Sequence, residues 1–164
     1  MVCEACELLP MLITDDQLKE LVLKTNLVTE TSFEQLKEFA KNSNIGLSDA
    51  LIEKDIITDE NLGVLISDFL HIPFIVLSKL SIPEDVFHII PERVARKQKI
   101  IPFAKDADGI KLAMVDPTNI EIQQAIAKKT GLRVFTYLTT ERDVDNVLRL
   151  YKKKLQKSFE QLLQ

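Results

Sequence analysis

The sequence predicts an α+β protein: an N-terminal helical repeat lobe followed by a small α/β sandwich lobe with a mostly antiparallel or mixed sheet. A helix-start pattern recurs within residues 12–71, and short strand-like runs alternate with helical patterns and turn residues within residues 72–155. The composition, 46% hydrophobic and 28% charged, is typical of a globular chain. We expect residues 1–11 to be a flexible N-terminus and residues 156–164 a C-terminal helical tail or linker.

Threonines open the expected helices of the first lobe. Thr14, Thr29 and Thr58 each follow an apolar residue and precede an acidic one. Such a Thr can cap free backbone N–H groups, and the acid favours the positive end of the helix dipole. The apolar positions also repeat at an offset of 29 residues: Leu18, Val22, Leu23, Leu27 and Val28 match Leu47, Leu51, Ile52, Ile56 and Ile57. We therefore expect two packed repeats, each a short helix, a tight turn and a second capped helix.

Four short runs bounded by turn residues predict the strands of the second lobe, and the first of them is rich in β-branched residues. The expected strands are residues 72–77, 100–104, 110–115 and 132–138. Helices are expected to begin near Pro83, Pro91, residue 120 and Thr140, where Pro or polar turn residues precede the helical pattern. Gly109 suits the hairpin between the second and third strands. We expect the helices to cover one face of the sheet.

Charge and hydropathy exclude two classes of partner. The net charge of -4 gives no electrostatic case for nucleic acid as a main partner. The basic cluster within residues 93–99 is typical of a solvated helix face, although it could also meet an acidic partner. No apolar run is long enough to cross a bilayer, and Glu4 and Glu7 stand where a secretory signal needs positive charge. We expect a cytoplasmic protein without direct membrane insertion.

The sequence offers no catalytic or metal-binding set. Cys3 and Cys6 form a lone CxxC, whereas a four-ligand zinc site needs a second pair, and His71 and His88 have no paired spacing. No strand precedes the CxxC to hold it as in thioredoxin-like folds. No Ser or Cys forms a convincing nucleophilic set with either histidine. We expect no enzyme activity and no cofactor, and the role of the two cysteines stays open.

A series of short motifs runs through residues 82–154. They are Ile82-Pro83-Glu84, Ile89-Ile90-Pro91-Glu92, Ile100-Ile101-Pro102, Leu112-Ala113-Met114-Val115-Asp116-Pro117-Thr118-Asn119, Thr130-Gly131-Leu132 and Thr139-Thr140-Glu141. Their order and spacing resemble the N-terminal domain of type II secretion and type IV pilus assembly ATPases. With the repeat lobe, the resemblance covers residues 12–155.

The resemblance implies a noncatalytic docking and regulatory role. In that family the domain precedes a hexameric ATPase core in cis, and it docks onto a cytoplasmic domain of an inner-membrane platform protein. The implied location is therefore cytoplasmic, peripheral to the inner membrane through partners. This sequence contains no phosphate loop of the GxxxxGKS or GxxxxGKT type. Either it is part of a longer protein or it is a stand-alone adaptor of the same fold.

Some members of that family bind cyclic di-GMP through helical repeats with a motif that contains RLGxxLL, a second Gly and a terminal Gln, in copies 29 residues apart. Here the spacing and the apolar positions agree, but the ligand-facing positions differ. The Arg position holds Gln17 and Gly46, the first Gly position Lys19 and Ser48, the second Gly position Asn26 and Asp55, and the final Gln position Ala40 and Phe69. Arg supplies a planar fork for phosphate, and Gly permits close backbone approach. We expect protein docking to be kept and nucleotide binding lost, with a cyclic di-GMP sensor as the alternative.

Overall fold

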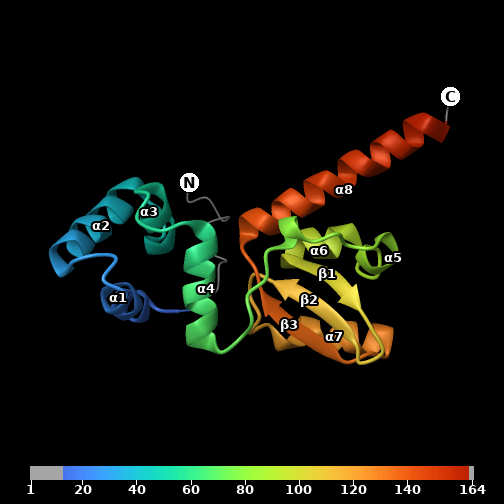
Figure 1. Cartoon of the computed structure of the whole chain (residues 1–164), viewed down its shortest axis with the longest axis horizontal. Coiled ribbons are helices and arrows are strands. Elements are labelled where there is room, and N and C mark those ends of the chain that lie inside the picture. Colours follow the sequence, from blue (N-terminus) through green and yellow to red (C-terminus); the bar gives the residue numbers. More distant parts are fainter. Residues whose placement is uncertain (1–12, 163–164) are drawn as a thin grey trace. The chain divides into compact units, whose positions relative to one another are not determined.

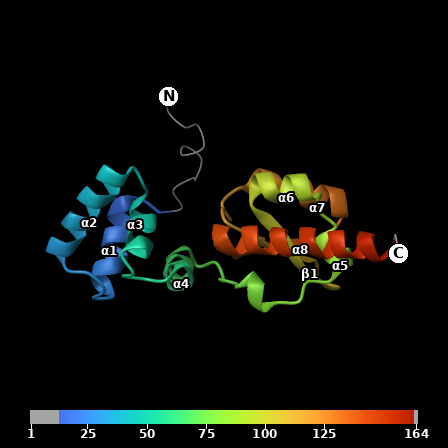
Figure 2. The same ribbon diagram turned by 90° about the horizontal axis from the view of Figure 1, so that it is seen from above.

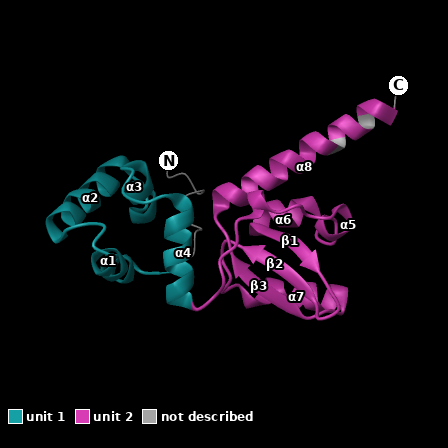
Figure 3. Cartoon of the chain, viewed as in Figure 1, with its two compact units in different colours: residues 1–70 teal, residues 71–164 magenta. Residues whose placement is uncertain are grey.

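The computed structural model describes residues 13–162, apart from the side chains of residues 155 and 159. The chain divides into two compact units between Leu70 and His71 (Figure 3). Unit 1, which ends at Leu70, is helical, and unit 2, which begins at His71, combines a small sheet with helices (Figure 1). This arrangement confirms the predicted α+β class.

Unit 1 consists of two helix pairs in its described part. The helices are α1 (Asp15–Lys24), α2 (Glu30–Ser43), α3 (Leu47–Glu53) and α4 (Asp59–Leu70). The predicted starts are confirmed for three of them, because the hydroxyl oxygens of Thr14, Thr29 and Thr58 each accept a bond from the backbone N–H three residues later, at 3.2 to 3.3 Å. Val22 and Leu51, which match across the repeat, are both fully buried in the core of this unit.

Unit 2 is built on a three-stranded mixed sheet. Its elements are η2 (Leu77–Lys79), α5 (Glu84–Phe87), α6 (Glu92–Gln98), β1 (Ile100–Lys105), β2 (Ile110–Met114), α7 (Ile120–Thr130), β3 (Val134–Leu138) and α8 (Glu141–Leu162). Strands β1 and β2 pair antiparallel as the expected hairpin. Strands β2 and β3 pair in parallel, in register from Ile110 opposite Val134, so the chain between them crosses over through α7.

The strand expected over residues 72–77 is reduced to a single bridge, so that expectation was wrong. The backbone of Leu138 donates to the Pro73 carbonyl at 2.8 Å and accepts from the Ile75 N–H at 2.9 Å, beside the edge of β3. Pro73 has no N–H with which to extend this ladder. Directly afterwards the Leu77 N–H is held by the carboxylate of Asp143, where η2 begins. The chain therefore leaves the sheet after three residues.

Helices α6 and α7 lie on the same side of the sheet, as Figures 1 and 2 show together. Helix α8 is fixed to this unit by Tyr151, whose hydroxyl donates to the Ile82 carbonyl and whose ring stacks on Phe87 at a centroid distance of 3.6 Å. Burial raises the pKa of the Tyr151 hydroxyl. Helix α8 runs unbroken across residues 155 and 156, and its last turns project past the sheet (Figure 1).

Candidate functional site

The eight positions that the family resemblance assigns to a nucleotide all lie in unit 1. Gln17 and Lys19 stand in α1, and Ala40 stands near the end of α2. In the second copy, Gly46 precedes α3, Ser48 lies in its first turn and Phe69 lies at the end of α4. Asn26 and Asp55 occupy the tight turns that follow α1 and α3.

The backbone of the two turns is the same in both copies. Asn26 and Asp55 are left-handed, with φ of 52° and 53°. In each turn the next residue closes the helix end, since the Leu27 N–H donates to the Val22 carbonyl at 3.3 Å and the Ile56 N–H to the Leu51 carbonyl at 3.1 Å. This is the helix ending that Gly usually makes without steric cost. Both turns therefore adopt a geometry that suits Gly, although neither position is Gly.

Gln17 uses its side chain to cap its own helix. Its Oε1 accepts from the Thr14 N–H at 2.8 Å, and its N–H donates to the Thr14 Oγ1 at 3.2 Å. This reciprocal pair is a capping box, which satisfies two backbone donors at the start of α1. The sequence could have shown it, because Gln three residues after Thr is the signature of the motif.

Lys19 joins α1 to α2. Its Nζ lies 3.6 Å from a carboxylate oxygen of Glu30 and 3.5 Å from one of Glu34, and 5.6 Å from the centre of the Phe33 ring. Its side chain is 29% exposed. A position that Gly would leave open for a ligand is thus occupied by a cation held by two acidic residues. The sequence does not reveal these contacts, because they depend on how the two helices pack.

The remaining positions offer little for recognition of phosphate. Ala40 is buried in the core of unit 1, and Gly46 has no side chain with which to bind. Ser48 is half-buried, Asp55 is exposed and Phe69 is 39% exposed. Lys19 is therefore the single cationic side chain among the eight positions.

The other features that the sequence singled out have structural roles. In the polar loop after β2, the N–H and hydroxyl of Thr118 both donate to a carboxylate oxygen of Asp116. The side-chain oxygen of Asn119 then accepts from the Ile122 N–H at 3.4 Å and caps α7. This loop is a turn that starts a helix.

Residues 13–162 contain no group of three or more His, Cys, Asp or Glu side chains arranged to hold a metal. The Nε2 of His88 lies 3.9 Å from a Glu84 carboxylate oxygen, within one helical turn. Cys3 and Cys6, together with the expected flexible segment 1–11, lie outside the described residues. In the described part of the chain no helix has the length and hydrophobicity to span a membrane.

Comparison with known proteins assigns the chain to a family through its second unit. Residues 70–157, more than half of the chain, match the model of the MshEN domain. The type IV pilus assembly ATPase PilB of Myxococcus xanthus is 23% identical over 135 residues, which cover 82% of this chain and 24% of PilB. PilB of Thermus thermophilus is 26% identical over 131 residues, which cover 79% of this chain and 15% of that protein. The chain thus spans a quarter or less of these relatives.

Two solved structures share the fold. The structure of MshE with cyclic di-GMP superposes with a TM-score of 0.63 at 23% identity, covering 80% of this chain and 96% of that one. The N-terminal domain of XpsE gives a TM-score of 0.55 at 16% identity, covering 82% and 93%. Together with the PilB relatives, these matches confirm the resemblance to the N-terminal domains of pilus assembly and secretion ATPases.

Proposed function

The chain belongs to the MshEN domain family, and from this premise we propose that it is a noncatalytic docking and regulatory domain. It would act at the N-terminus of a type II secretion or type IV pilus assembly ATPase and couple that motor to a cytoplasmic domain of an inner-membrane platform protein. The similarity to PilB supports the link to a motor. The sequence itself has no phosphate loop, so the hydrolysis would be done by an ATPase core outside it.

One observation carries the choice of docking over nucleotide sensing. In the first repeat, the side chains that replace the family's ligand positions are used to hold the lobe together. Gln17 closes the capping box, and Lys19 bridges to Glu30 and Glu34. A ligand would have to break these contacts before it could use the site.

The charge of unit 1 supports the same choice. Residues 13–70 contain twelve acidic residues against five lysines and no arginine. A dianionic nucleotide approaching this lobe meets a field of its own sign. The second copy adds Asp55 at a position where the family pattern has Gly. We therefore propose that cyclic di-GMP is not a ligand of this chain.

Docking is tested by immobilising the full chain and titrating it with the cytoplasmic domain of an inner-membrane platform protein from the same organism. We expect saturable binding with a Kd of about 1–10 µM, typical of a transient interface. A control domain of equal net charge from an unrelated membrane protein should not bind. If no platform component binds the chain, the proposed function is wrong.

A cyclic di-GMP sensor is the second candidate because Asn26 and Asp55, at the second Gly positions of the motif, both have the left-handed backbone that Gly favours. Isothermal titration calorimetry of the full chain decides between them, with MshE as the positive control. We expect no saturable heat up to about 100 µM nucleotide. Micromolar or tighter binding would show that the altered side chains still recognise the ligand.

A further inference from the structure

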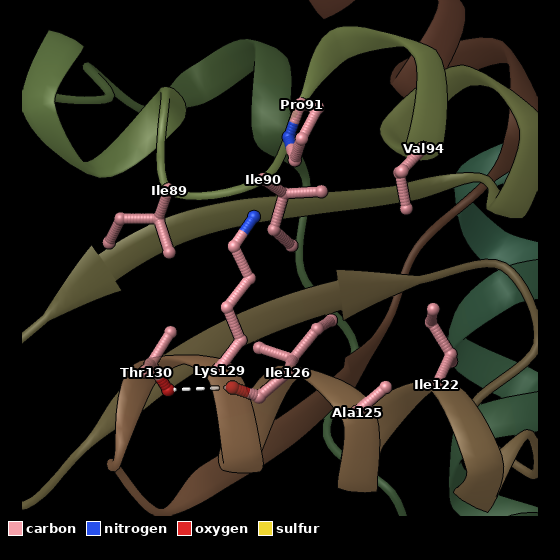
Figure 4. Close-up of a pocket in the computed structure, with 9 residues that line it drawn as sticks. All are labelled: Ile89, Ile90, Pro91, Val94, Ile122, Ala125, Ile126, Lys129 and Thr130. Carbon is pink, nitrogen blue, oxygen red and sulfur yellow. Dashed lines mark hydrogen bonds between the residues drawn. The ribbon is translucent and has the colours of Figure 1, made fainter.

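An apolar groove lies within unit 2, between α7 and the segment that leads into α6 (Figure 4). Ile90 and Val94 form one wall, and Ile122, Ala125 and Ile126 form the other. The two walls face each other, and the strands of the sheet run behind them (Figure 4). All lining residues belong to this one unit, so the groove does not depend on where unit 1 lies.

The size and lining of the groove favour protein side chains over a small molecule. Its volume is about 220 Å³, below the roughly 300–1,000 Å³ of ordinary small-molecule sites. Of its lining residues only Thr130 and Lys129 have polar side chains, and the Thr130 hydroxyl already donates to the Ile126 carbonyl at 2.8 Å (Figure 4). Such a site has almost nothing with which to orient a polar ligand.

Lys129 is the polar group that the groove offers to a partner. Its ammonium group extends from α7 across the groove toward Ile90 (Figure 4). Within residues 13–162, Lys129 takes part in no ion pair. An unpaired cation beside an apolar surface is suited to a carboxylate that arrives with apolar neighbours.

The two helices that flank the groove are cationic, although the whole chain has a net charge of -4. Their charged residues are Arg93, Arg96, Lys97, Lys128 and Lys129 against Glu92 and Glu121. Arg96 is paired with Glu92 at 2.7 Å, one helical turn away. This leaves four cations and one carboxylate on the two helices. The surroundings of the groove therefore favour an acidic partner.

We propose that this groove docks an acidic amphipathic helix of a partner protein. Its aliphatic side chains, spaced three and four residues apart, enter between Val94 and Ala125, and a carboxylate on the same helix pairs with Lys129. A helix docked between α6 and α7 could pack against both by fitting its side-chain ridges into their grooves. The inference rests on the proposed function in one respect, since it places the docking helix in the platform protein.

The groove is tested directly with a synthetic probe. The probe is a lactam-stapled amphipathic peptide of about 14 residues with Leu at docking positions and Glu beside them, and its counterpart has Lys in place of each Glu. In two-dimensional NMR of the labelled full chain, the acidic peptide should shift the amide signals of Val94, Ala125 and Lys129. The basic peptide should bind at least about tenfold more weakly. Equal affinities, shifts confined to other regions, or no binding of the acidic peptide would overturn the inference.

Matched variants connect the groove to the partner. Lys129→Glu and Ala125→Glu change exposed residues that line the groove, whereas Lys152→Glu and Gln156→Glu make the same charge changes on exposed residues of α8, which does not line it. The first pair should weaken binding of both the platform domain and the acidic peptide by about tenfold or more, and the second pair by less than about twofold. Circular dichroism melting of each variant checks that the fold is intact.

The outcomes separate the two proposals. If the platform domain binds all four variants as tightly as the wild type, the groove is not the docking site and the proposed function stands. If the platform domain does not bind the wild type while the acidic peptide shows the expected pattern, the proposed function fails and the groove inference stands. Concentration-dependent dimers that Lys129→Glu abolishes would identify a second copy of the chain as the occupant and overturn the assignment to a partner protein.

Discussion

Removing the carboxylate of Asp143 should destabilise unit 2 far more than removing that of Asp145. Asp143 is 8% exposed and lies in the first turn of α8. It accepts from the backbone N–H of Leu77, from that of Ser78 at 3.1 Å, and from the Thr139 hydroxyl at 3.5 Å. These bonds attach the chain at η2 to the start of α8.

The size of the effect follows from the bonds that are lost. A hydrogen bond to a charged group contributes about 1.5–3 kcal/mol, and both backbone donors would be left without an acceptor. Relief of the buried charge offsets part of this, so Asp143→Ala should cost about 3–5 kcal/mol. Asp145 instead pairs with Lys99 at 2.8 Å, and its side chain is 44% exposed. Asp145→Ala should therefore cost about 0.5–1 kcal/mol.

Urea denaturation followed by tyrosine fluorescence measures this difference in unit 2 alone. The chain has two Tyr and no Trp, and Tyr137 and Tyr151 both lie in unit 2. Circular dichroism, which reports on both units, serves as the second probe because two units need not unfold together. Free energies of unfolding for the two variants that agree within about 1 kcal/mol would refute the reasoning.

Two further predictions concern the sheet of unit 2. Gly109→Ala should cost about 2–3 kcal/mol of stability because the new Cβ would lie 2.3 Å from the Arg133 carbonyl oxygen. Gly131→Ala should cost about 1 kcal/mol, because Gly131 has φ of 69° but no neighbour within 4 Å of the new Cβ. Equal melting temperatures of the two variants would contradict this. A hydrogen bond from Lys111 lowers the pKa of Asp106, with further help from backbone N–H groups. Because the folded pKa lies below the unfolded one, this stabilisation is present above the unfolded pKa and is lost as pH falls through the folded pKa. Below about pH 4 the wild type should therefore lose stability more steeply than Asp106→Asn in urea titrations, and parallel pH profiles would argue against it.

The elements that could be predicted from the sequence are those fixed by neighbours along the chain. Thr14, Thr29 and Thr58 were identifiable as helix caps because a cap bonds to a backbone group three residues away. The prediction of a strand at residues 72–77 was wrong because the conformation of this segment depends on a residue that is distant in the sequence. The carboxylate that holds the Leu77 N–H lies 66 residues further along the chain.

The same division applies to the two sites. The eight altered positions of unit 1 could be located by their spacing, and the capping box of Gln17 follows a known pattern. The ion pairs of Lys19 could not be found, because they depend on the packing of α1 against α2. The groove of unit 2 was not predicted at all. Its walls come from residues 89–94 and 122–130, which the parallel crossover between β2 and β3 brings together.

The packing of the repeat explains how unit 1 can keep its shape without its ligand residues. The core depends on apolar positions such as Val22 and Leu51, both fully buried, and of the eight altered ligand positions Ala40 alone lies in it, as a small apolar residue. Replacing the ligand positions therefore leaves the core intact, and Gln17 and Lys19 even add contacts of their own. Unit 2 differs from the acidic unit 1 in the sign of its net charge, because residues 71–164 carry sixteen Lys and Arg against eleven Asp and Glu. An acidic protein attracted to this chain by charge would meet repulsion at unit 1 and attraction at unit 2, which is where Lys129 and the apolar groove lie.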